Sequence, residues 1–150
     1  MTKLQEQLNS ARARVEALKP DDHSEEAKRS LEHLGASCRA LGLWDEALKA
    51  FDRCLQLCER KKDWAGVSGF LIWKSNVFCH SGVYGRAIEL ATQATSVHPT
   101  DPEKSNHMSY YLAMPHLMLG DISKYVSLQE QALDSLRTAP KDERNVRKPW

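Results

Sequence analysis

The sequence predicts an all-α fold of about seven helices, arranged as a solenoid of helical hairpins. Apolar residues recur at steps of three and four along nearly the whole chain, which is the periodicity of an amphipathic helix. No segment has the alternating pattern of a strand. Glycines 42, 82 and 120 stand 40 and 38 residues apart, each between two helical segments, which indicates a repeated hairpin.

The first helix is expected within residues 1–20, where Lys19 and Pro20 end the helical pattern. Its outward positions are polar, so we expect it to cap the N-terminal end of the array. Its apolar positions share one helix face and comprise Leu4, Leu8, Ala11, Val15 and Leu18.

Three helical hairpins are expected next, in residues 24–62, 64–98 and 101–138. Ser24 supplies a capping oxygen for the first of them. A polar run closes the first hairpin and the sequence HPTDP closes the second. A single hairpin cannot bury both sides of its apolar stripe, so successive hairpins are expected to stack.

The third hairpin departs from the pattern, because Pro115 lies inside its first helix. An interior proline costs about 3 kcal/mol or kinks the helix. We therefore expect a bend between Tyr111 and Pro115, or a last hairpin that packs loosely. Residues 139–150 contain few apolar side chains, and we expect a disordered tail.

Composition excludes several classes of protein. The chain has 150 residues, of which 41% are hydrophobic and 27% charged, so one globular domain is expected. A net charge of +1 provides no general field for nucleic acid, and the tail's Lys141, Arg144, Arg147 and Lys148 are diluted by acids. No apolar run is long enough for a membrane span or a signal peptide, so we expect a cytoplasmic or nuclear protein without membrane contact.

Enzymatic chemistry is not expected. The sequence has no glycine-rich phosphate loop, no Gly-x-Ser-x-Gly and no His-Glu-x-x-His, so we predict neither a catalytic residue nor a cofactor. Cys38, Cys54, Cys58 and Cys79 lack the Cys-x-x-Cys spacing of a zinc site. Cys54 and Cys58 would share a helix face, which allows either a metal pair or core packing, and we favour core packing without metal.

The first hairpin, with the sequence LEHLGASCRALGLWDEALKAFDRC, resembles a tetratricopeptide repeat. The second hairpin is in register with it, with Ser75 in place of the glycine, and the third departs further at Tyr125 and Gln129. The spacing of 38 to 40 residues is similar to that of the long-repeat subclass of this family. The residues that carry the resemblance in the first hairpin are Leu31, Leu34, Gly35, Ala47 and Phe51.

The resemblance implies a curved array whose first helices line a concave groove for a peptide or a partner helix. The chain would then be a non-catalytic adaptor or scaffold. Helical periodicity places cations at one end of this groove and aromatic or apolar side chains at the other, so an acidic and hydrophobic peptide is the expected ligand. The candidate groove residues are Arg29, His33, Arg39, Trp73, Asn76, His80, Tyr110 and Met114.

Two of these residues have a second interpretation. Asn76 follows the glycine position of its repeat, where the long-repeat subclass uses an asparagine to hold a peptide main chain, but it could also be solvated or bonded within its own helix. Trp73 could anchor a ligand or be partly buried between hairpins, and we favour the buried role.

The main alternative is a role in assembly. No polar capping helix follows the last hairpin in the sequence, so its outer side is expected to stay apolar. This end would dock onto a larger complex or onto a second copy of the chain. The candidate assembly residues are Ile122, Tyr125, Leu133 and Leu136.

Overall fold

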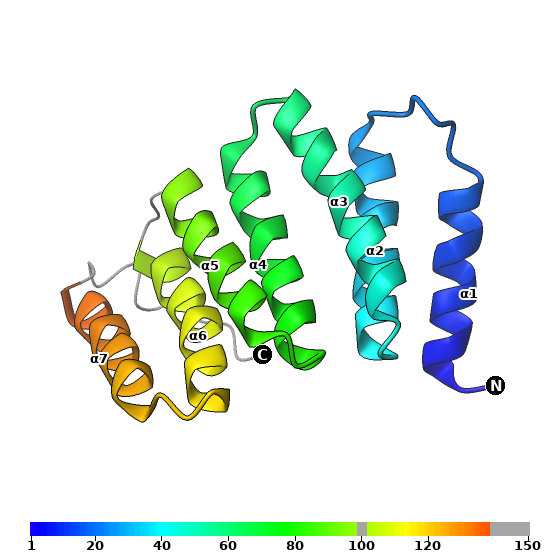
Figure 1. The fold of residues 1–150 in the computed structure, drawn as a ribbon. Coiled ribbons are helices and arrows are strands. Elements are labelled where there is room, and N and C mark those ends of the chain that lie inside the picture. Colours follow the sequence, from blue (N-terminus) through cyan, green and yellow to red (C-terminus); the bar gives the residue numbers. More distant parts are fainter. Residues whose placement is uncertain (99–101, 139–150) are drawn as a thin grey trace.

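The computed structural model describes residues 1–98 and 102–138. Within them the chain forms helices and no strand, which confirms the predicted all-α hairpin fold. The helices follow one another in a row, with α1 at one end and α7 at the other (Figure 1). They are α1 (Lys3–Glu16), α2 (Glu25–Ala40), α3 (Trp44–Arg60), α4 (Trp64–His80), α5 (Tyr84–Val97), α6 (Pro102–Met118) and α7 (Ile122–Thr138).

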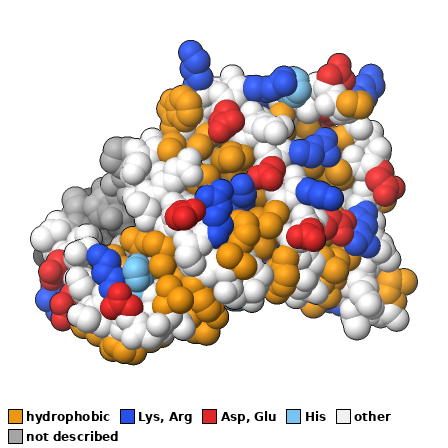
Figure 2. All heavy atoms as spheres, in the orientation of Figure 1, with side chains coloured by type: hydrophobic (Ala, Val, Ile, Leu, Met, Phe, Trp, Pro, Cys, Tyr) orange, Lys and Arg blue, Asp and Glu red, His pale blue; other side chains and the backbone are white. Residues whose placement is uncertain are grey.

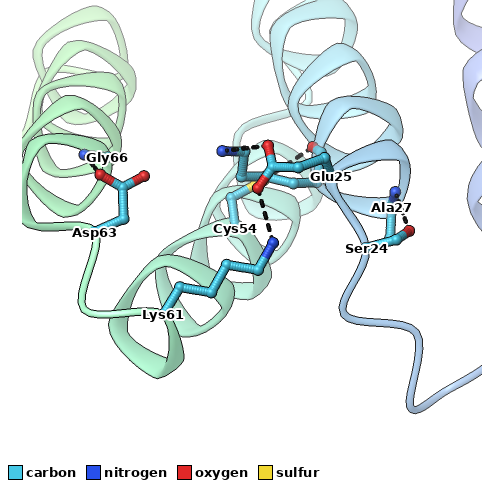
Figure 3. Close-up of polar contacts among 8 residues, drawn as sticks. Ser24, Glu25, Ala27, Cys54, Lys61, Asp63 and Gly66 are labelled. Carbon is cyan, nitrogen blue, oxygen red and sulfur yellow. Dashed lines mark hydrogen bonds and ion pairs between the residues drawn. The ribbon is translucent and has the colours of Figure 1, made fainter.

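Short polar side chains start several of these helices. Ser24 accepts a hydrogen bond from the backbone N–H of Ala27 at 3.1 Å, as expected for an N-cap. Asp63 does the same for Gly66 at 3.0 Å at the start of α4. Figure 3 shows both caps, together with the acidic first turn of α2 beside the end of α3. Two orphan donors are thereby satisfied.

The turns within the three hairpins share one geometry. Gly42, Gly82 and Gly120 adopt positive φ angles of 73°, 86° and 82°, which place them in the left-handed region that glycine enters at little cost. In each turn the next N–H donates to a carbonyl of the preceding helix, as from Leu43 to Cys38 at 2.9 Å. This is the Schellman closure. The glycine spacing in the sequence therefore marks real helix ends.

The turn between the first two hairpins has the same closure without a glycine. The N–H of Asp63 donates to the carbonyl of Cys58 at 2.9 Å, and Lys62 occupies the left-handed position with a φ of 54°. A lysine is costly there, because its Cβ crowds the following carbonyl oxygen. The polar run that predicted a loop did not reveal this turn type.

The core runs through the first two hairpins as a continuous layer of buried apolar side chains, which α1 joins through Leu8 and Ala11, and Tyr111 and Leu112 of α6 pack against it. Arg12 ties α1 to α3, because its Nε and Nη2 donate to the two carboxylate oxygens of Glu46 at 2.8 and 2.6 Å. Each helix packs on its neighbours in the chain, and α4 also contacts α6. The hairpins are therefore stacked, as the repeat predicted.

The C-terminal end is different, because large apolar side chains stay exposed there. Figure 2 shows apolar side chains gathered along the lower left edge, where the α6–α7 turn lies in Figure 1. The exposed members at this end are Met118, Leu119, Ile122, Val126 and Leu133.

Helix α6 continues as one helix through Pro115, which is buried. The predicted disordered tail, residues 139–150, lies outside the described residues. Among the helices that the structure describes, none combines the length and apolar character that crossing a bilayer requires.

Candidate functional site

Three of the predicted groove residues meet on the face formed by the first helices of successive hairpins. Arg39 Nη1 in α2 donates a hydrogen bond to Asn76 Oδ1 in α4 at 2.9 Å. The guanidinium carbon of Arg39 also lies 5.2 Å from the centre of the Trp73 ring, within the range of a cation–π interaction. We call Arg39, Trp73 and Asn76 the Arg39 cluster.

The fold explains why these side chains meet. Arg39 lies in the last turn of α2, where a cation is favoured by the negative end of the helix dipole. Trp73 is half-buried and stacks on Phe51 of α3, with ring centres 5.5 Å apart and planes inclined by 19°. The aromatic pair therefore holds a flat surface against which the guanidinium lies. Trp73 serves as partly buried packing, the interpretation that the sequence favoured.

The charge of Arg39 has no acidic partner among the described residues. Arg39 is half-buried, yet none of the ion pairs in that part of the chain includes it. Its Nε is buried and has no hydrogen-bond partner there. Burying a cation without a compensating anion is unfavourable, so the cluster retains unused capacity for a negative ligand.

Tyr111 of α6 lies close to this cluster. Burial raises the pKa of the Tyr111 phenol, and the nearby charge of Arg39 opposes that rise. Tyr111 also packs edge-to-face against Tyr110, with ring centres 5.3 Å apart. Arg39 of α2 thus lies near an aromatic ring of α4 and an aromatic ring of α6.

Tyr111 and Phe51 were not predicted as site residues. Tyr111 stands 38 residues after Trp73, so it occupies the same position in the next repeat, and this spacing could have identified it. Phe51 matched the repeat pattern as a core residue, and no feature of the sequence indicated that it would also support Trp73.

The other five predicted groove residues are not members of the Arg39 cluster. His80 stacks on Trp44 of α3, with ring centres 6.5 Å apart. Arg29 and His33 are exposed on α2, Tyr110 is 52% exposed, and Met114 is half-buried. No hydrogen bond, ion pair or ring contact within residues 1–98 and 102–138 joins any of these five to the cluster.

The cysteines do not form a reactive site. Cys38, Cys54 and Cys58 are buried, and burial raises the pKa of Cys38 to about 11 and that of Cys54 to about 12. These thiols stay protonated at neutral pH, so they are poor nucleophiles and poor metal ligands. Among the described residues no group of histidine, cysteine and acidic side chains could hold a metal ion.

The candidate assembly residues divide into two pairs. Ile122 and Leu133 are 56% and 51% exposed, whereas Tyr125 and Leu136 are half-buried. Only the first pair is therefore freely available on the surface of α7.

Comparison with known proteins adds one match. The family model for the tetratricopeptide repeat matches residues 30–63, from the first part of α2 to the cap of α4. None of the curated proteins matches the chain. Residues 30–63 are thus similar to a tetratricopeptide repeat, and the chain has an all-α, tetratricopeptide-like helical repeat fold.

Proposed function

We propose that this protein is a non-catalytic interaction module, an adaptor or scaffold that holds an acidic and hydrophobic peptide, or a partner helix, on the face of α2, α4 and α6. One observation carries the proposal: the Arg39 cluster places a half-buried cation without an acidic partner among the described residues beside aromatic rings. A carboxylate would complement the cation, and the rings would give apolar contact area at a low entropic cost.

Further features support this assignment. The match of residues 30–63 to the tetratricopeptide repeat suggests protein partners, and domains of this family are generally non-catalytic. The glycine spacing of 40 and 38 residues favours the long-repeat subclass. We place the module in the cytoplasm or nucleus, where unpaired thiols such as those of the four cysteines stay reduced.

The experiment that tests this function selects peptides from a random library on the immobilised full-length chain. Selected peptides should combine acidic and apolar residues and should lose affinity for Arg39→Ala by about tenfold or more. Arg137→Ala is the matched control, because Arg137 is also the basic residue in the last turn of its helix. Recovery of no peptide, or of peptides that bind Arg39→Ala and wild type equally, would contradict the proposal.

A second candidate function is favoured by the surface of α7. Ile122 and Leu133 are exposed, whereas Trp44 and Leu55, at the same repeat positions in α3, are partly buried and pack against the core. Glu130 occupies the same repeat position in α7 as Asp52 does in α3, and Asp52 forms an ion pair with Lys74 of α4 at 2.6 Å. This surface is suited to docking a further helix, as in a subunit of a larger complex or a homodimer.

Sedimentation velocity over a wide concentration range tests the homodimer arm of this alternative. A dimer would have twice the 17.0 kDa mass of one chain, and Ile122→Asp should return it to the monomer. Leu4→Asp is the control at the opposite end, because Leu4 is 45% exposed. A monomer at every concentration would remove the homodimer and leave only docking onto a different protein.

A further inference from the structure

The orientation of the Asn76 amide follows from its neighbour. A guanidinium has five donors and no acceptor, so the atom of Asn76 that faces Arg39 Nη1 at 2.9 Å must be the amide oxygen. The Nδ2 group of Asn76, which carries two N–H donors, then points away from that bond. Asn76 has thereby engaged one of the two lone pairs of its oxygen with Arg39, while both N–H donors of Nδ2 stay available for another molecule.

Both remaining donor groups are unpaired within the described residues. Arg39 Nη2 and Asn76 Nδ2 make no hydrogen bond with the described residues. Within those residues, Arg39 Nε is the only side-chain nitrogen or oxygen atom that is buried without a partner, so Nη2 and Nδ2 are not fully buried. Two donor groups are therefore available on two side chains, from α2 and α4, that one hydrogen bond joins.

The cluster is also held in place before any ligand arrives. The Arg39 guanidinium is fixed by the Asn76 oxygen and by the Trp73 ring, and Trp73 is in turn supported by Phe51. Such preorganisation reduces the entropy that binding must remove.

From this geometry we propose that Arg39 and Asn76 form a carboxylate-binding site for an aspartate or glutamate side chain of the bound peptide. A carboxylate offers acceptors only and carries the charge that would complement Arg39. A peptide main chain needs both a donor and an acceptor, and one of the two lone pairs of the Asn76 oxygen is already taken by Arg39. The site thus reads acidic side chains, in contrast to the main-chain clamp that the position of Asn76 had suggested.

The identity of the ligand rests on the proposed function, whereas the anion site can be tested by itself. The probes are N-acetyl-glutamate N-methylamide and its neutral counterpart, N-acetyl-glutamine N-methylamide, added to the full chain. Heteronuclear NMR follows the Asn76 amide group, the Arg39 Nε–H and the Trp73 indole N–H. The glutamate probe should give saturable shifts in the millimolar range, and the glutamine probe should not.

Two substitutions sharpen the test. Asn76→Asp keeps an acceptor for Arg39 but replaces the free donors by a negative charge, so the affinity for the glutamate probe should fall by about tenfold to a hundredfold. Arg39→Lys keeps the charge without the planar fork and should bind the probe about tenfold more weakly. Arg137→Ala should bind as wild type does.

The outcomes separate this inference from the proposed function. Equal shifts with both probes, no saturable shift, or full affinity in Asn76→Asp would each overturn the carboxylate site. If the glutamate probe binds as expected but the library selection recovers no peptide, the site stands and the adaptor function fails. If peptides are recovered while the probe fails, the adaptor stands without this site.

Discussion

The first two hairpins bring their helices together by different means at the same repeat positions. In α2–α3, Gly35 faces the ring of Phe51 so closely that a Cβ on Gly35 would lie 2.6 Å from a ring carbon. In α4–α5, Ser75 stands where the glycine would be, and its hydroxyl donates to the carbonyl of Ala87 at 2.7 Å. Ala91 replaces the phenylalanine there, so a larger residue on one helix is matched by a smaller one on the other.

The same exchange occurs at the other end of the two hairpins. In the first, Cys54 Sγ of α3 donates to the carbonyl of Lys28 in α2 at 3.6 Å. In the second, Ser68 Oγ of α4 donates to the carbonyl of Ala94 in α5 at 2.9 Å. The donor side chain is therefore on the second helix of the first hairpin and on the first helix of the second hairpin. The repeat specifies where two helices meet, and each hairpin solves that contact with its own pair of residues.

The largest effect on stability is expected from Phe51→Ala. This change gives the first hairpin the residue type that the second hairpin has at the same repeat position, Ala91. Loss of a fully buried ring should lower the free energy of unfolding by about 3–5 kcal/mol. The measurement is the urea midpoint and slope of each variant.

The double variant Phe51→Ala with Gly35→Ser transplants the arrangement of the second hairpin. Gly35→Ser should be harmful in the wild-type background, where it meets the ring, and nearly harmless in the Phe51→Ala background, so the two changes should not be additive. Additive effects would mean that the pairing of sizes does not hold the hairpin together.

A smaller loss is expected from Gly35→Ala. Its Cβ would overlap the Phe51 ring, and overpacking of this kind costs about 1–3 kcal/mol. Gly69→Ala in α4 is the matched control, because no atom lies within 4 Å of its added Cβ and alanine is favoured over glycine in a helix by about 1 kcal/mol. Opposite signs are expected in thermal or urea unfolding, and a stabilising Gly35→Ala would refute the close contact between Gly35 and the ring.

Ser75→Ala should have an effect of about 1 kcal/mol, since it removes one buried hydrogen bond without opening a large cavity. Unfolding by urea measures the loss. Gly35 has no side-chain hydroxyl and makes no such bond in the first hairpin. An unchanged urea midpoint for Ser75→Ala would show that only the size of residue 75, and not its hydrogen bond, contributes to the stability of the second hairpin.

Lys62→Gly should stabilise the protein by about 0.5–1 kcal/mol, because glycine adopts a φ of 54° without the clash of a Cβ. The reverse change at an equivalent turn, Gly82→Ala, should destabilise by a similar amount. Differential scanning calorimetry compares the two. A loss of stability in Lys62→Gly would indicate that the interactions of the lysine side chain stabilise the fold by more than the strained backbone at residue 62 destabilises it.

The smallest effect concerns Glu25, which joins the start of α2 to the end of α3 and has no counterpart at Ala65 in the second hairpin. Lys61 and Lys28 lower the pKa of Glu25 to about 2 from an ordinary value of 4.5. The ion pairs therefore stabilise the folded protein above pH 4.5, and the contribution is lost as the pH falls toward 2.

Glu25→Gln should slightly lower the melting temperature at neutral pH, and this difference should shrink as the pH falls from 4.5 toward 2. The difference should shrink in high salt, because these side chains are exposed and screened. A difference that persists at low pH would assign the effect to something other than charge.

Much of the fold could be predicted because its signals are local. Helical periodicity, the cap at Ser24 and the glycines at the hairpin turns each depend on residues within a few positions of one another. Lys62 was missed because a left-handed lysine has no sequence signal. Arg39 and Asn76 were each predicted to line the face, but the bond between them spans 37 residues and two helices, so no local pattern contained it.

By itself the sequence determined where the helices begin and end and that three hairpins recur, because backbone hydrogen bonds and amphipathic faces act over a few residues. The tertiary structure decided how each pair of helices fits and which donors of the Arg39 cluster stay available. Those outcomes depend on side-chain volumes and hydrogen-bond partners brought together from different hairpins, which only the packed array places within contact distance.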